Sequence, residues 1–154
     1  MTGCALCVER PKASSKNWKS DRGVAMIGNL NKEQLEGLLE AIPVEISFVD
    51  ENDSVRFWNK HETRIFKRPI SVIGKSVQNC HPKQSVDKVN QVLADLKSGK
   101  RESADFWINL GDRKVYIRYF PVRDKTGKYL GTLEATQDIT QIRKIEGEKR
   151  LLKY

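Results

Sequence analysis

The sequence predicts an α+β protein with a five-stranded antiparallel sheet and a helical insertion in the middle. Two segments have apolar residues at helical spacing, and five others have the alternating or continuous apolar character of strands. Their order along the chain is helix, two strands, helices, three strands and helix. Turn sequences join the strands as hairpins, so we expect the sheet to be antiparallel.

Composition limits the class of protein. A chain of 154 residues, 38% hydrophobic and 31% charged, is long enough for one domain with a buried core. No run approaches the roughly 20 apolar residues that span a bilayer, and no secretory signal follows Met1. Three cysteines make an odd set for disulfide pairing, which favours a reducing, cytoplasmic compartment.

The net charge of +8 is concentrated at the two ends. Residues 1–23 and residues 143–154 each carry five basic and two acidic side chains. A basic domain can bind nucleic acid, but the signs are mixed throughout this chain. We therefore expect no specific nucleic-acid binding and no membrane association.

The first third begins with a flexible arm over residues 1–29, which shows neither helical nor strand periodicity. A helix is expected to begin after Asn31, because Gln34 follows at the spacing of a capping box. Its apolar face consists of Leu35, Leu38, Leu39 and Ile42. Pro43 ends the helix, because proline disfavours helical backbone in the preceding residue.

The remaining elements follow from changes in period. A short helix is expected at residues 60–67 and a longer one at residues 85–97, with Gly99 as its C-terminal cap. A charged helix should run from about Thr140 to Tyr154. The expected strands are residues 44–49, 54–59, 105–110, 114–123 and 129–138.

The last hairpin predicts what each face of the sheet carries. If Arg123 pairs with Lys128, Tyr119 faces Thr132, and further along Ile117 faces Glu134 and Val115 faces Thr136. This face mixes aliphatic and polar groups, as a cup for a small polar ligand would. The opposite face carries Tyr116, Arg118, Phe120, Gly131, Leu133 and Ala135 and suits packing against the first helix or a second subunit. A slip of one residue would exchange the two faces.

Glu134 is interpreted in two ways. If it is buried, it must be paired or protonated, and Arg118 and Tyr119 are its expected partners. The alternative is a solvent-facing glutamate on an edge strand.

Several motifs resemble those of PAS domains. The strongest are the hairpin from Val122 to Gly127 and the closing sequence from Thr136 to Thr140, which contains Asp-Ile-Thr; Ile73-Gly74 is a further match. The resemblance covers residues 31–154 and implies the PAS fold, a five-stranded antiparallel sheet with central helices on one face, flanked by terminal helices. It implies a domain over residues 30–140 and a separate C-terminal helix at 141–154.

A narrower resemblance connects the chain with the C-terminal PAS domain of a bacterial and archaeal family that often carries an uncharacterised helical domain and sometimes a hemerythrin-like domain. It rests on the segments 79–82, 106–108, 117–120 and 146–152. Where that subfamily often has a second histidine in the central helix, this chain has Asp87.

The PAS resemblance implies a sensor that holds a small molecule between sheet and central helices. The candidate ligand-binding residues are His81, Cys80, Trp58, Trp107, Arg118, Tyr119, Thr132, Glu134 and Thr136. For Trp58 and Trp107, the alternative to ligand binding is packing in the core. The apolar face of the first helix is the candidate homodimer surface: Leu35, Leu38, Leu39 and Ile42. No output domain is recognisable, so the output is expected from a separate protein or from self-association. A ligand-free interaction module is the alternative.

Cys80-His81-Pro82 raises the question of a cofactor. His81 is a candidate haem ligand, with the Cys80 thiol as a neighbour, but it precedes the central helix instead of lying on it. The alternative has His81 capping the following helix while Cys80 packs as a small apolar group. Flavin photochemistry is not expected, because the sequence around Asn79-Cys80 departs from the flavin photoadduct motif.

Metal binding and catalysis find little support. Cys4 and Cys7 form half of a metal or redox motif, and four zinc ligands would require Cys80 and His81 or a second chain. The sequence contains only two histidines and no nucleophile elbow or phosphate-binding glycine loop. We expect a protein that is not an enzyme.

Overall fold

The computed structural model describes residues 26–60 and 62–151, so most of the expected arm, with Cys4 and Cys7, lies outside the described residues. The two α-helices are α1 (Lys32–Ala41) and α2 (Lys83–Ser98). The strands are β1 (Glu45–Asp50), β2 (Val55–Trp58), β3 (Ala104–Leu110), β4 (Arg113–Arg123) and β5 (Tyr129–Asp138). Short 3-10 helices are η1 (Met26–Asn29), η2 (Ile70–Val72), η3 (Val77–Cys80) and η4 (Ile142–Lys144).

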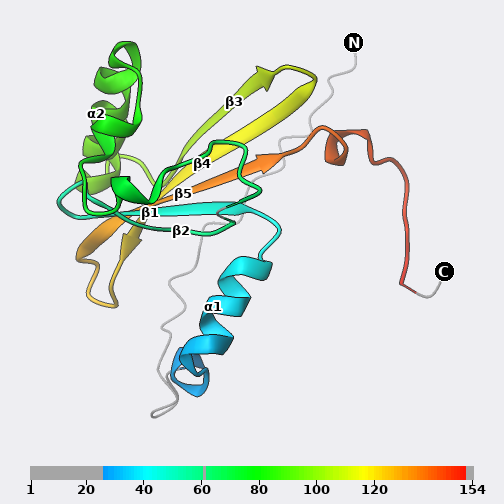
Figure 1. The fold of residues 1–154 in the computed structure, drawn as a ribbon, viewed down its shortest axis with the longest axis horizontal. Helices are drawn as coiled ribbons and strands as arrows, with labels where there is room; N and C mark the ends of the chain where they lie inside the picture. Colours follow the sequence, from blue (N-terminus) through cyan, green and yellow to red (C-terminus); the bar gives the residue numbers. More distant parts are fainter. Residues whose placement is uncertain (1–25, 61, 152–154) are drawn as a thin grey trace, which may run out of the picture.

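The five strands form one antiparallel sheet in the order β2-β1-β5-β4-β3. The chain closes the sheet by inserting β5 between the first and second hairpins, which brings residues from both halves of the sequence together. Figure 1 shows α2 on one side of the sheet, while α1 extends away from the sheet instead of lying along it. The face toward α2 is called the inner face below, and the opposite one the outer face.

The expected capping box begins α1. The Asn31 side chain accepts a hydrogen bond from the Gln34 backbone N–H, and the Gln34 side chain accepts one from the Asn31 backbone N–H. At the other end, Asn59 joins α1 to the sheet. Its Nδ2 donates to the carbonyls of Leu39 (2.8 Å) and Val44 (3.0 Å), and its Oδ1 accepts from the Ile46 N–H (2.7 Å).

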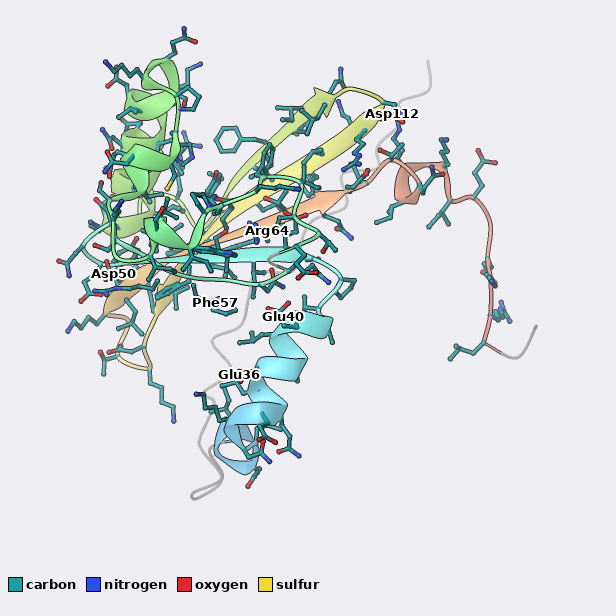
Figure 2. All side chains as sticks on the ribbon, viewed as in Figure 1. Glu36, Glu40, Asp50, Phe57, Arg64 and Asp112 are labelled. Carbon is teal, nitrogen blue, oxygen red and sulfur yellow. The ribbon has the colours of Figure 1, made fainter. Side chains whose placement is uncertain are left out.

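The expected helix at residues 60–67 is wrong, because a buried arginine holds this segment as a loop. Arg64 is nearly inaccessible to solvent and donates to the backbone carbonyls of Ile46, Asn59 and Phe66. Lys60, with a φ of 52°, is in the left-handed region at the start of the loop. Burial lowers the pKa of Arg64, and the Glu45 carboxylate opposes that shift. Figure 2 shows Arg64 in this loop near the middle of the molecule.

The expected C-terminal helix is also wrong over the described residues. Only η4 is helical, and the chain from Ile145 to Leu151 is irregular. Gly147 has a φ of 64°, which is incompatible with a continuing α-helix. Ile145 and Leu151, expected on the helix, are largely exposed. The contrast with the second helix is clear, because α2 ends where predicted, with Gly99 in the left-handed conformation.

The register of the last hairpin differs from the prediction by two residues. Tyr119 pairs with Glu134, Ile117 with Thr136 and Val115 with Asp138. The turn is one residue longer than expected, and an irregularity at Val122/Arg123 adds a second residue to β5. Because side chains alternate with a period of two, the two-residue shift leaves every side chain on its predicted face.

Candidate functional site

A cavity lies between α2 and the inner face of β3, β4 and β5. Its apolar compartment has a volume of about 270 Å³, and an adjoining polar compartment beside the 66–69 loop and η3 has a volume of about 590 Å³. The two compartments share His81, Ile117, Tyr119 and Glu134 in their linings. The sheet residues that line the cavity are two apart on each strand, Ile117 and Tyr119 on β4 and Thr132 and Glu134 on β5. Residues two apart on a strand point to the same side of the sheet.

The floor of the cavity is a buried ion pair. Arg68 Nη2 lies 3.0 Å from Glu134 Oε2 and 3.3 Å from Oε1. The two side chains are only 11% and 9% exposed. The Thr136 hydroxyl donates to Glu134 Oε1 at 3.2 Å. Glu134 is therefore buried and paired, which agrees with the first of the two sequence-based interpretations, but its cationic partner is Arg68 and not Arg118.

Tyr119 joins the polar floor to the apolar wall. It pairs with Glu134 across the strands, and its ring meets Phe106 edge-on, with centroids 5.9 Å apart. Burial raises the pKa of Tyr119 above its ordinary value, and the neighbouring Glu134 carboxylate raises it further. The hydroxyl is therefore neutral at physiological pH and can act as a hydrogen-bond donor in the cavity.

His81 lies at the boundary between the compartments and is half-buried. Its Nδ1 is 3.0 Å from the carbonyl of Val77, so the ring closes the end of η3. His81 does not cap the following helix, contrary to the second interpretation. α2 begins at Lys83 with Pro82 at its N-cap position, and no side chain caps it. The bond to a carbonyl requires a proton on Nδ1, which makes Nε2 the acceptor nitrogen of the neutral ring.

Three further candidates lie on the inner side. Thr132 lines the apolar compartment, and its hydroxyl is 2.7 Å from that of Tyr129. Cys80 lines the polar compartment while also packing against the core cluster of valines and Leu93. Trp58 packs against that same cluster and is absent from both linings. This agrees with the alternative interpretation, in which Trp58 packs in the core.

Trp107 and Arg118 lie outside the cavity, so the prediction that they bind the ligand there is wrong. Arg118 lies over the rings of Tyr116 (5.6 Å) and Phe120 (4.6 Å) on the outer face. Trp107 pairs with Tyr116 on that face and is 63% exposed. The reason is alternation, because each is one residue away from an inner-face residue on its strand.

Sequence reasoning missed Arg68 and the contribution of α2. Arg68 lies in an irregular loop before Pro69, where no periodicity marks a residue as buried. The α2 residues that line the cavity have helical spacing, so they are recognisable as an inward face but not as a cavity wall. They are Ser85, Lys88, Val89, Val92 and Leu93.

The described residues contain neither a candidate metal cluster nor a membrane-spanning helix. Among them, no group of three or more His, Cys, Asp or Glu side chains is placed to hold a metal ion. No helix within residues 26–60 and 62–151 is both long and apolar enough to cross a membrane.

Strand order, helical insertion and cavity together define an α+β domain in which a sheet and its central helix border a pocket. The PAS domain profile matches residues 35–140. The chain belongs to the PAS domain family. No protein of curated function matches it.

Solved structures agree with this assignment. The chain is similar to a C-terminal domain from Streptococcus mutans, with 34% identity, a TM-score of 0.71 and coverage of 76% of this chain and 91% of that one. It has the fold of the Bordetella pertussis BvgS PAS domain (22% identity, TM-score 0.55, coverage 73% and 91%). It also has the fold of a sensory box sensor histidine kinase structure from Vibrio cholerae (15% identity, TM-score 0.51, coverage 69% and 90%).

Proposed function

We propose that this PAS domain is a sensor that binds a small molecule between α2 and the inner face of the sheet. The observation that carries the proposal is a cavity with apolar walls and a buried Arg68–Glu134 pair as its floor. Ligand pockets typically combine apolar walls with a few fixed polar groups. His81, Cys80, Tyr119, Thr132 and Glu134 are the predicted residues that line this cavity, and we propose that they contact the ligand.

The proposed role is binding and not catalysis. Glu134 is held by Arg68 and Thr136, and Tyr119 keeps its proton at physiological pH. Neither group is therefore available as a general base near neutral pH. His81 Nδ1 faces a backbone carbonyl, with no carboxylate to orient it for proton transfer. One solved structure with the same fold is named a sensory box sensor histidine kinase, and that name supports sensing as the proposed role of the domain.

Native mass spectrometry of the freshly purified protein tests ligand binding, with one variant that fills the cavity. Val92 lines the apolar compartment, and Val92→Trp places an indole into that space. Val86→Trp is the matched control, because Val86 is a half-buried residue of the same helix outside both linings. We expect extra bound mass on the wild type and on Val86→Trp, and its loss from Val92→Trp. Extra mass that survives in Val92→Trp would contradict the cavity as the site.

We also propose that the signal leaves the domain through a homodimer or a separate output protein in the cytoplasm. The supporting observation is α1, none of whose residues is buried; Leu38 is 50% exposed on its apolar face. Leu35, Leu39 and Ile42 complete that face. An amphipathic helix normally buries its apolar face against another element.

The same surface supports the second candidate function, a ligand-free interaction module. Leu38→Asp should convert a dimer to a monomer in analytical ultracentrifugation. Glu33→Lys, on the polar side of α1, should leave the dimer intact. A dimer that tolerates Leu38→Asp would exclude this face as the interface.

A further inference from the structure

The starting observation is an unsatisfied, buried donor on Arg68, one of the side chains that line the polar compartment. Among the described residues, two buried side-chain atoms lack a hydrogen-bond partner, Arg68 Nε and Glu45 Oε2. Glu45 Oε2 lies 3.9 Å from Nη2 of Arg64, so a cation is close to it. Arg68 lines the polar compartment, and its contacts with Glu134 are made through Nη2, so the Nε–H is left without an acceptor. A buried donor without a partner is costly, which favours a ligand that supplies an acceptor.

Charge around the cavity favours a negative ligand. The linings of the two compartments contain three basic side chains, Lys67, Arg68 and Lys88. Glu134 is the anionic side chain in these linings. A ligand with one negative charge reduces the resulting positive excess. An arginine can serve two carboxylates at once, because its five N–H donors are distributed around a planar fork.

The rest of the cavity favours an apolar body. The compartment of about 270 Å³ is lined mainly by aliphatic and aromatic side chains, among them Val89, Leu93, Phe106 and Ile117. Apolar cavities of about 150 Å³ bind benzene, so this compartment has room for a substituted ring or a short branched chain. Tyr119 and Glu134 line both compartments, so the two spaces adjoin at these side chains, and a ligand that spans them would place its polar end near Arg68.

Resting on the function proposed above, we infer that the ligand is a small monocarboxylate with an apolar body. Its carboxylate accepts a hydrogen bond from Arg68 Nε in the polar compartment, and its body occupies the apolar compartment under α2. Phenylacetate is a probe of this chemistry. Toluene is the matched probe that retains the apolar body, and phenylacetamide retains the acceptor oxygen without the charge.

The test is isothermal titration of ligand-stripped protein with the three probes, on wild type, Arg68→Lys and Arg143→Met. Arg68→Lys keeps a cation beside Glu134 but has no Nε–H. Arg143→Met removes an exposed charge from the 3-10 helix η4, away from the cavity. We expect wild type to bind phenylacetate at least tenfold more tightly than either neutral probe, in keeping with a charge-assisted hydrogen bond. Arg68→Lys should remove most of that preference, and Arg143→Met should retain it.

The outcomes separate this inference from the proposed function. Toluene binding as tightly as phenylacetate would overturn the carboxylate while supporting the cavity as a binding site. A carboxylate preference that survives Arg68→Lys would overturn the assignment to Arg68. Failure of all three probes would overturn the inference, whereas the bound-mass experiment on Val92→Trp would still decide the proposed function. If Arg68→Lys does not fold, the comparison of probes on wild type still tests the carboxylate.

Discussion

Removing Arg68 should destabilise the protein strongly, because it leaves a carboxylate buried without its cation. In the folded protein the Glu134 side chain is 9% exposed, and the Arg68 nitrogen lies 3.0 Å from its oxygen. The hydroxyls of Thr136 and Tyr119 stay beside Glu134 in the variant, but neutral hydrogen bonds do not replace an ion pair. Breaking a buried pair from one side typically costs about 3–5 kcal/mol. We therefore expect Arg68→Met to lower the free energy of unfolding by about that amount in urea titrations.

A double-mutant cycle distinguishes this mechanism from simple loss of packing. Arg68→Met combined with Glu134→Leu removes both charges and keeps side-chain volume, so it should recover most of the lost stability. Arg150→Met is the control, because the Arg150–Glu148 contact is shorter (2.7 Å) but both side chains are more than 70% exposed. Such exposed pairs contribute little, so this variant should unfold like the wild type. A loss below about 1 kcal/mol in Arg68→Met, or no recovery in the double variant, would refute the reasoning.

Three other predictions follow from particular contacts. Asn59→Ala should cost about 2–4 kcal/mol in urea unfolding, because three partly buried backbone groups lose their partner; a smaller loss would mean that water replaces the amide. For Asp50, burial raises the pKa, but bonds from the Ser54 and Asn52 amides and from Arg56 lower it below the ordinary 3.8. Its stabilisation is therefore complete above pH 3.8 and lost as pH falls through the lowered value, and Asp50→Asn should flatten this acid-side loss in pH-dependent thermal melts. Absorption near ~400 nm tests the haem alternative, with His81 Nε2 as the ligand; a Soret band that His81→Ala retains would exclude that ligand.

Much of the fold is encoded locally and was predictable from the sequence. The capping box at Asn31, the glycine cap at Gly99 and the five strands lie where residue spacing predicted them. The faces of β4 and β5 were also predicted, because alternation with a period of two is a local property. The helix at residues 60–67 was mispredicted, because composition does not show that the Arg64 side chain turns inward to bond backbone carbonyls.

Only the tertiary structure decided the contents of the cavity. Arg68 and Glu134 are 66 residues apart, and their pairing depends on a loop without periodicity meeting the central strand of the sheet. The register of the last hairpin likewise depended on the actual length of the turn and on one irregularity in the pairing. Sequence periodicity reports which side of an element is apolar, because that follows from local backbone geometry. The pairing of buried charges depends on contacts between distant segments. These contacts form only when the whole sheet is assembled.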